Sequence, residues 1–361
     1  MAEKKGTPLS GVAGIPPEVT TKLSGFWITT AEELVSAAAQ EGGLQGLVTL
    51  TGQTEAEMTR LVELAVAALP AGVPFGPGEK KPHGMGALDE RQHEDWGRAA
   101  VPFAVLPPSI DFHDRLALVR NQEQRSTCVA FACTAVREYL VGPLVSSAAN
   151  FSEQYLYWNC KQHDLIPFGK GTYVKTGMQQ METDGIPPEA AWPYNPNLIN
   201  GNESQDPPPT GLPPLAAPNR ITGYTQISPT NVDALRQELA NGNPVAFTVP
   251  VFTYWFSEPT HSSGDVRLPL PGEKIEGGHA MCMVGYQTDP DVPGGGYFLV
   301  RNSWGPDWGS KSPVAPGHAR IPFAFINEYG SSAYTARVTS NDVQPVGFFA
   351  RLWDGLKHLF G

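Results

Sequence analysis

A cysteine, a histidine and an asparagine stand at places in this sequence where they could take part in nucleophilic chemistry. Cys128 follows Ser126 and Thr127, which can cap a helix, and the next residues continue as a mostly apolar helix. The dipole and free amides of a helix amino terminus stabilise an anion, and a protonated histidine nearby adds to that effect. We therefore expect the pKa of Cys128 to fall from about 8.5 into the range of roughly 3.5–7.5. Taken alone, a single cysteine in an apolar helix is more often a buried hydrophobic residue.

The histidine and the asparagine lie at the ends of two predicted strands. His279 begins the strand predicted at 279–286, directly after Gly278, and Asn302 ends the strand predicted at 296–302. A lone histidine at a strand is usually structural, so this one gains meaning only together with the cysteine. The other seven histidines show no metal-ligand spacing among themselves. We expect neither a metal nor another cofactor.

In the order cysteine, histidine, asparagine, these residues resemble the catalytic centre of the papain-like cysteine peptidases. Gln122 lies six positions before Cys128, as it does in that family. The other matching motifs are Asn302-Ser303-Trp304-Gly305 followed by Trp308-Gly309, Ile110-Asp111-Phe112, Ser152-Glu153-Gln154 and Trp192-Pro193-Tyr194. Agreement at so many separate positions is not expected by chance. The resemblance implies an α+β, papain-like, two-lobed peptidase with a helical lobe and a β-barrel-like lobe.

The resemblance also implies roles for four catalytic residues. The thiolate of Cys128 would attack a peptide carbonyl and form a thioester acyl-enzyme, while His279 holds the thiolate as an ion pair and later donates a proton to the leaving amine. Asn302 would orient the imidazole by accepting a hydrogen bond from its other nitrogen. The Gln122 side chain and the Cys128 amide would bind the oxyanion.

Three further residues are implied to contact the substrate or protect the site. Trp304 would shield the histidine–asparagine bond from water. Gly171, within Gly169-Lys170-Gly171-Thr172, takes the place of the family's channel-lining glycines, and Gly278 precedes the histidine. With Gly277 and apolar residues on a facing strand, Gly278 would border an open apolar pocket, which favours large hydrophobic substrate residues.

The sequence departs from the family's pattern around the nucleophile. The family usually has a tryptophan directly after the cysteine and another cysteine three positions before it, where this chain has Val129 and Arg125. Cys160 matches the usual disulfide partner of that missing cysteine and is expected to be unpaired. Its unpaired state fits a reducing cytosol, as in bacterial intracellular relatives.

Residues 1–70 are predicted to form a small all-α module. Thr30 with Glu33 and Thr54 with Glu57 are capping boxes that predict helices near 31–40 and 55–69. The stretch around Gly14-Ile15-Pro16 resembles helix-hairpin-helix modules, which often bind DNA, but Pro16 has no amide hydrogen to offer a phosphate. Acidic residues exceed basic ones in this segment, so we favour protein docking over DNA binding.

The rest of the chain divides into three predicted parts. Residues 71–107 are a linker or a segment like the pro-segment of a zymogen, which either restrains the peptidase or is a passive tether. Residues 108–345 form the peptidase domain, within which the proline-rich stretch 206–218 separates two halves. Residues 346–361 form an amphipathic helix, for which packing on the module, a protein partner or a membrane surface are all open.

Composition limits the remaining function classes. The 361 residues carry a formal net charge of −11, which argues against nucleic acid or an anionic membrane as the main partner. Four cysteines are too few for a disulfide scaffold, and neither a signal peptide nor a membrane-spanning run is evident. We expect a cytoplasmic cysteine endopeptidase that acts on proteins or peptides. The alternatives are a catalytically silent papain-fold scaffold and a peptide acyl transferase that uses the same nucleophile.

Overall fold

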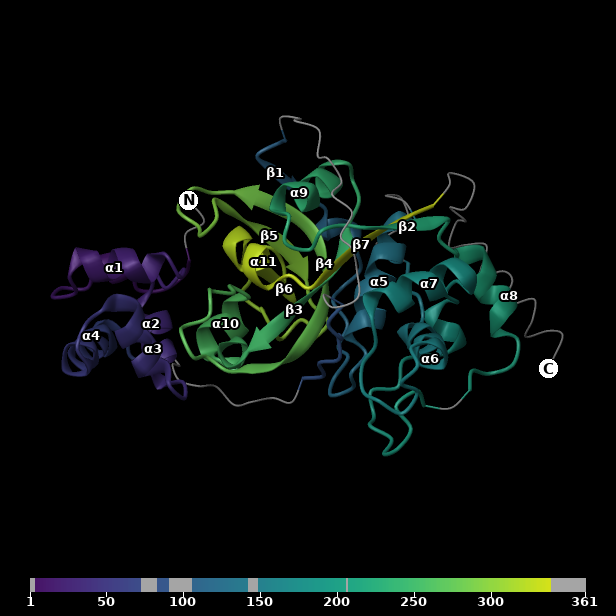
Figure 1. Ribbon diagram of the computed structural model, residues 1–361, viewed down its shortest axis with the longest axis horizontal. Helices are drawn as coiled ribbons and strands as arrows, with labels where there is room; N and C mark the ends of the chain where they lie inside the picture. The colour runs from purple at the N-terminus through teal and green to yellow at the C-terminus, as the bar shows by residue number, and fades with distance from the viewer. Residues whose placement is uncertain (1–3, 73–82, 91–105, 142–148, 206, 339–361) are drawn as a thin grey trace.

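The computed structural model describes residues 4–72, 83–90, 106–141, 149–205 and 207–338. Figure 1 shows three groups of elements along the long axis of the molecule: the N-terminal helices at the left, a curved sheet in the middle and a second group of helices at the right. The sheet and the right-hand helices share one continuous apolar core, whereas the N-terminal helices have a core of their own.

The sheet is antiparallel and holds the predicted histidine on one strand and the predicted asparagine directly after the neighbouring strand. Its described strands follow the order β2-β7-β3-β4-β5-β6, and β1 pairs with β4. These pairs leave β2 and β6 as edges, so within the described residues the sheet curves without closing into a barrel. The strands are β1 (Ser109–Asp111), β2 (Gly223–Gln226), β3 (Val245–Phe252), β4 (Ile275–Thr288), β5 (Gly296–Arg301), β6 (His318–Pro322) and β7 (Ser332–Arg337).

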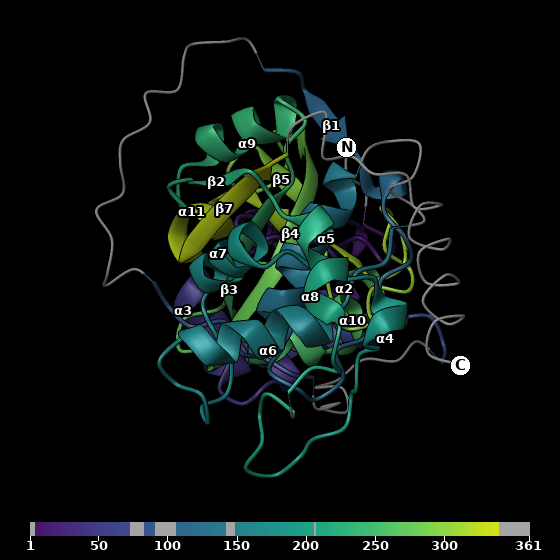
Figure 2. The ribbon, with the colours of Figure 1, turned by 90° about the vertical axis from the view of Figure 1, so that its right-hand side faces the viewer.

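The central helix of the molecule is α5 (Cys128–Leu140), at the position that the sequence predicts. Nearly all of its residues are buried, because it packs against β4 on one side and against the other helices of its lobe on the other. Figure 2 shows those neighbours around α5. The helices of this lobe are α6 (Glu153–His163), α7 (Val174–Thr183) and α8 (Leu212–Ala216), and those beside the sheet are α9 (Val232–Ala240), α10 (Glu258–Ser263) and α11 (Phe323–Tyr329).

Among the described residues, four α-helices precede the predicted peptidase domain. Both predicted capping boxes are present, with the Thr30 and Thr54 hydroxyls accepting from the amides of Glu33 and Glu57. Apolar faces of these helices meet in a separate core. The helices are α1 (Pro17–Ser24), α2 (Ala31–Ala39), α3 (Gly43–Thr51) and α4 (Glu55–Ala68).

The N-terminal helices are attached to the sheet side of the molecule by apolar contacts. Leu270, from the loop after α10, is buried within the core of the helices. In the opposite direction, Trp27 enters the main core and stacks on Tyr297 with ring centroids 6.2 Å apart. The amide of Leu268 donates to the carbonyl of Phe26 at 3.1 Å. Each part thus buries a large side chain of the other.

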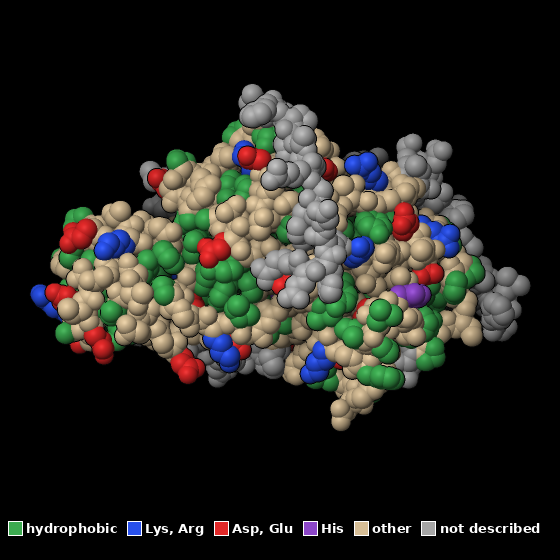
Figure 3. All heavy atoms as spheres, in the orientation of Figure 1, with side chains coloured by type: hydrophobic (Ala, Val, Ile, Leu, Met, Phe, Trp, Pro, Cys, Tyr) green, Lys and Arg blue, Asp and Glu red, His purple; other side chains and the backbone are tan. Residues whose placement is uncertain are grey.

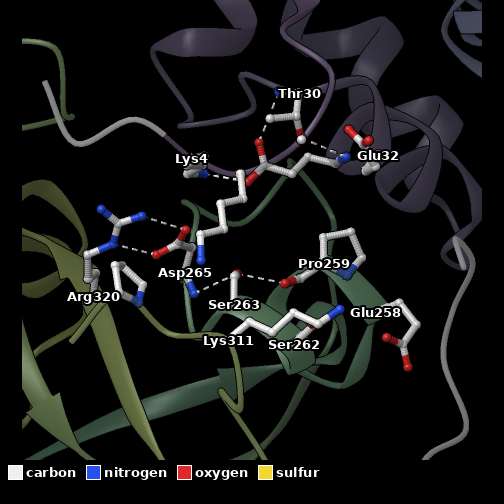
Figure 4. A pocket seen from close by; sticks show the side chains of 14 residues that line it. Lys4, Thr30, Glu32, Glu258, Pro259, Ser262, Ser263, Asp265, Lys311 and Arg320 are labelled. Atoms are coloured by element: carbon white, nitrogen blue, oxygen red, sulfur yellow. Dashed lines mark hydrogen bonds and ion pairs between the residues drawn. The ribbon is translucent and has the colours of Figure 1, made fainter. Parts of the chain in front are cut away.

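Charged side chains surround a cavity of about 280 Å³ at the same junction. Figure 4 shows Lys4, from the N-terminal part, opposite Asp265 and Arg320 of the sheet side. Arg320 binds both carboxylate oxygens of Asp265, at 2.6 and 2.7 Å, and Lys4 pairs with Glu33. Burial lowers the pKa of Lys4, while Glu33 opposes that shift.

The structure changes one prediction about the segments outside the main elements, that for the proline-rich stretch. Another, the C-terminal helix, lies outside the described residues. The proline-rich stretch was expected to be a separator, but Leu212–Ala216 forms α8, and Leu212 and Leu215 pack beside Tyr155. Two prolines in its first turn are compatible with a helix start, because those amides need no partner within the helix. The predicted helix at 346–361 lies outside the described residues. None of the described helices has the length and apolar content that crossing a bilayer requires.

Candidate active site

Cys128 is the first residue of α5 and is completely buried. The expected capping is wrong: among the described residues, Thr127 makes no side-chain hydrogen bond to the amides of the helix. Its hydroxyl instead lies 2.8 Å from the hydroxyl of Tyr194, which donates to the carbonyl of Gln122 at 2.9 Å. Tyr194 thus connects the start of the helix to the residue predicted to bind the oxyanion.

His279 and Asn302 are brought together by the pairing of β4 with β5. The Nε2 atom of His279 lies 2.8 Å from the Oδ1 atom of Asn302, and both side chains are buried. The other ring nitrogen, Nδ1, has no hydrogen-bond partner among the described residues. The thiol of Cys128 lies beside the amide of Ala280, the next residue after His279. The thiol therefore lies next to the strand residue that follows the histidine.

Trp304 covers the histidine as the resemblance implies. Its ring stacks on His279 with centroids 4.5 Å apart and an angle of 25° between the planes. Trp304 also stacks on His83, at 4.7 Å, so the tryptophan lies between two imidazole rings. Only 1% of Trp304 is exposed, which keeps water away from the histidine–asparagine hydrogen bond.

Gln122 is held in a defined orientation inside the site. Its Oε1 atom accepts a hydrogen bond from the Ser303 hydroxyl at 2.6 Å. With Oε1 bound to Ser303, the amide nitrogen of Gln122 points away from that serine. There it donates to the carbonyls of Arg125, at 2.7 Å, and Gly84, at 3.0 Å. The position of Ser303, directly after the asparagine, did not by itself reveal this role.

Residues 83–90, which we call the covering segment, lie across the site. Four backbone hydrogen bonds hold the segment, and their partners lie on both sides of it. The amide of Gly84 donates to Glu123 at 2.6 Å, that of Ala87 to Gly278 at 3.1 Å, that of Leu88 to Thr172 at 3.1 Å, and the amide of Thr172 donates back to Gly86 at 2.9 Å. The covering segment therefore contacts Gly278 and Trp304, both predicted to bind substrate.

Gly171 allows the covering segment to approach closely. Its φ of +78° favours glycine, and a Cβ atom there would lie 2.0 Å from the carbonyl oxygen of Gly86. The predicted substrate-binding residues Gly171, Gly278 and Trp304 thus all lie against the same segment.

The covering segment reverses the expected ionisation of the cysteine. Burial raises the pKa of Cys128 to about 11, although the amides of Ala280, Gly86, Val129 and Ala87 act in the opposite direction. Burial also lowers the pKa of His279 to about 4. Both shifts favour the neutral thiol and the neutral imidazole. The expected low thiol pKa is therefore wrong for the covered site, because desolvation outweighs the helix terminus.

Arg125, which stands where the family usually has a cysteine, forms a buried polar network. All four cysteines are free and buried, Cys160 included. The guanidinium of Arg125 donates to the side chain of Gln154 at 2.6 Å and to the carbonyl of Asn195 at 2.7 Å, and a third bond reaches the carbonyl of Glu203 at 3.3 Å. These bonds connect the loop before α5 with α6 and with the loop after Asn195, much as a cross-link would.

A cysteine at a helix amino terminus, beside a histidine that is bound to an asparagine, is the arrangement of a thiol peptidase. Residues 106–315 match the family described as papain family cysteine protease. That match covers more than half of the chain, and the chain belongs to this family. The fold and the site are thus those of a papain-family protein.

Individual relatives agree with the family match. The chain is 28% identical to chymopapain of Carica papaya over 247 residues, which are 68% of this chain and 62% of chymopapain. It is 25% identical to a peptidase C1-like protein of Acanthamoeba polyphaga mimivirus over 183 residues, 48% of this chain and 54% of that protein. The chain thus spans less than two thirds of the length of both. Xylellain, a cysteine protease from Xylella fastidiosa, is 22% identical and has the same fold, with a TM-score of 0.60 over 72% of this chain and 97% of xylellain.

Proposed function

We propose that this chain is an endopeptidase that hydrolyses peptide bonds through a thioester on Cys128. The observation that carries the proposal is the buried His279–Asn302 hydrogen bond next to the amino terminus of α5. In the proposed reaction Cys128 transfers its proton to His279, and the thiolate adds to the peptide carbonyl. His279 then donates that proton to the leaving amine. A water molecule that loses a proton to the same imidazole attacks the thioester and releases the acid.

Gln122 and the amide of Cys128 are the proposed oxyanion donors. The Gln122 amide nitrogen already donates to a carbonyl, that of Gly84, so a substrate carbonyl in the same place would receive this bond. The Ser303 hydroxyl keeps the donor aimed there. A donor that is oriented before the reaction stabilises the developing charge without the cost of reorganisation.

We further propose that the covering segment keeps the enzyme inactive until it is displaced. Three observations support inhibition over a passive tether: the segment's bond to Gln122, its backbone pairing with Gly278 and Thr172, and the complete burial of Cys128 beneath it. A peptide substrate would need the same backbone partners and the same oxyanion donor. The segment and a substrate therefore exclude one another.

For the whole chain we propose a module at 1–70, a pro-segment-like region at 71–107, a peptidase domain at 108–345 and a C-terminal amphipathic helix at 346–361. The separate core of α1–α4 supports the first boundary. Figure 3 shows more acidic than basic side chains on the visible face of α1–α4, which favours a protein partner for targeting or regulation over nucleic acid. A cytoplasmic location fits the four buried thiols.

A peptide library tested beside an epoxide probe of active-site cysteines would test the proposed function. In a chain whose covering segment is displaced, as we expect for Gly84→Val, we predict a covalent adduct on Cys128 and cleavage inside peptide chains, both lost when Cys128→Ala is added. Cleavage that survives Cys128→Ala in purified protein would refute the proposal. A silent scaffold predicts neither cleavage nor a rapid adduct. An acyl transferase predicts that added amines, rather than water, capture most of the acyl group.

A further inference from the structure

The covering segment ends in a buried carboxylate that is bound by the papain-like part of the chain. Glu90 is only 4% exposed. Its Oε1 atom accepts a hydrogen bond from the backbone amide of Lys175 at 3.2 Å, and its Oε2 atom accepts one from the Tyr334 hydroxyl at 2.9 Å. A buried carboxylate is costly unless its oxygens have partners. The pocket meets that requirement, because each oxygen has at least one donor among the described residues.

Both donors belong to elements that remain when the covering segment leaves. Lys175 is the second residue of α7 (Val174–Thr183), and amides in the first turn of a helix favour a negative charge. Tyr334 is on β7, where its side chain is 1% exposed and its residue pairs with Ala246 of β3. The site for a carboxylate is therefore built into α7 and β7.

The pocket lies along the same cleft as the nucleophile. The amide of Leu88, two residues before Glu90, is bound to the carbonyl of Thr172, and Ala87 is bound to Gly278 next to the histidine. Burial raises the pKa of Cys133 on α5, and the carboxylate of Glu90 adds to that increase. Cys133 is five residues after Cys128 in the same helix, so the carboxylate lies close to the helix that carries the nucleophile.

We propose that this pocket is a carboxylate-binding subsite of the uncovered cleft. The inference rests on the proposed peptidase function. The enzyme then cleaves peptides with a glutamate near the scissile bond faster than otherwise identical peptides with glutamine. This preference for glutamate is separate from the preference for large hydrophobic residues that we expect at Gly277 and Gly278. Glu90 occupies a different pocket, which is formed by α7 and β7.

The test uses the full chain in a form whose cleft is open. In the double variant Gly84→Val, Glu90→Gln, the valine overlaps the backbone at Arg125 and the glutamine removes the chain's own carboxylate. Fluorogenic peptides would carry glutamate, glutamine or leucine at each of three positions before the scissile bond. We expect kcat/KM for glutamate to exceed that for glutamine at least about 10-fold at one position, because hydrogen bonds to charged groups are the stronger ones.

Two tyrosine variants test whether the pocket is responsible. Tyr334→Phe, added to the double variant, keeps the ring and should reduce the glutamate-to-glutamine ratio to about 3-fold or less. Tyr224→Phe is the matched control, because this neighbouring ring lies 6.1 Å from that of Tyr334 and makes no contact with Glu90 among the described residues. It should leave the ratio unchanged.

Three outcomes would overturn the inference: no position favours glutamate, the ratio survives Tyr334→Phe, or both tyrosine variants reduce it equally. The pocket would then serve the covering segment alone. Cleavage without acid preference refutes only this inference, whereas failure to cleave any peptide refutes the peptidase proposal. In that second case a binding measurement still tests the subsite. The same peptides would be titrated against the Gly84→Val, Glu90→Gln chain that also carries Cys128→Ala. Glutamate peptides that bind no tighter than glutamine peptides would overturn the subsite.

Discussion

A valine in place of Gly84 should open the site without changing the peptidase lobes. A Cβ atom at this position would lie 1.8 Å from the carbonyl oxygen of Arg125 and 2.8 Å from the Gln122 amide nitrogen. Both distances are far inside van der Waals contact. The hydrogen bonds that hold the covering segment contribute about 1 kcal/mol each, whereas ordering each of its residues costs about 1–2 kcal/mol, so these bonds leave no surplus against a clash. We therefore expect the overlap to displace the segment.

Opening the site should change the ionisation of Cys128. With a pKa of about 11, only about 10⁻⁴ of the thiol is ionised at pH 7 in the covered site. Exposure to water removes the main cause of the raised pKa and lets the helix terminus and a protonated histidine lower it into the range of roughly 3.5–7.5. The thiolate fraction at pH 7 then rises about 10³-fold or more. Because nucleophilicity falls with pKa, we expect ionisation to accelerate alkylation by up to about 10²-fold, and access of the reagent to the thiol adds to that gain.

Intact-mass measurement of iodoacetamide labelling across pH would test this expectation. In the unchanged chain, labelling of Cys128 should rise only toward the raised thiol pKa of about 11. In Gly84→Val it should persist well below pH 8, while Cys133, Cys160 and Cys282 stay unreactive. Gly223→Val is the matched control, because a Cβ atom at Gly223 has no described neighbour within 4 Å. The reasoning is refuted if Gly84→Val is labelled no faster than Gly223→Val.

Three further predictions concern the oxyanion donor, the histidine–asparagine pair and the N-terminal helices. In the opened enzyme, Gln122→Ala should lower kcat by about 10²–10³-fold because one oxyanion donor is lost; a change confined to KM would contradict that role. Asn302→Ala should reduce kcat less than His279→Ala, since it removes orientation and leaves the base. The reverse order would show that the asparagine does more than orient the ring. Leu270→Ala should lower the free energy of unfolding by about 2–5 kcal/mol, because it leaves a cavity in the core of the N-terminal helices. Denaturant unfolding measures this loss, which exposed Leu118→Ala should not reproduce.

The residues that we propose as catalytic could be selected from the sequence because they lie in short motifs with fixed spacing. Cys128 begins a helix, and His279 and Asn302 lie on or directly after the strands that the local patterns predict. Gln122 followed from the resemblance, because the family has a glutamine six positions before the cysteine. In each case the local sequence determines the element, and the family resemblance relates the elements to one another.

The covering segment was only partly predictable. Its sequence has no helix or strand period, and its backbone bonds are made to residues far away in the chain, such as Gly278. The place of Glu90 depends on the donors of Lys175 and Tyr334, which no local pattern brings together. The pKa of Cys128 was predicted in the wrong direction for the same reason: the helix terminus is local, whereas the burial that outweighs it comes from the covering segment.

The most direct test of the account is to trap the acyl-enzyme and locate it. The Gly84→Val chain would be mixed with a peptide ester, quenched with acid within the first turnover, and examined by intact-mass and peptide mapping. We predict a mass increase equal to the acyl group on the fragment that contains Cys128, and its decay as free acid appears. An acyl group found on another residue would contradict the account. So would ester hydrolysis at an undiminished rate in the Gly84→Val chain that also carries Cys128→Ala.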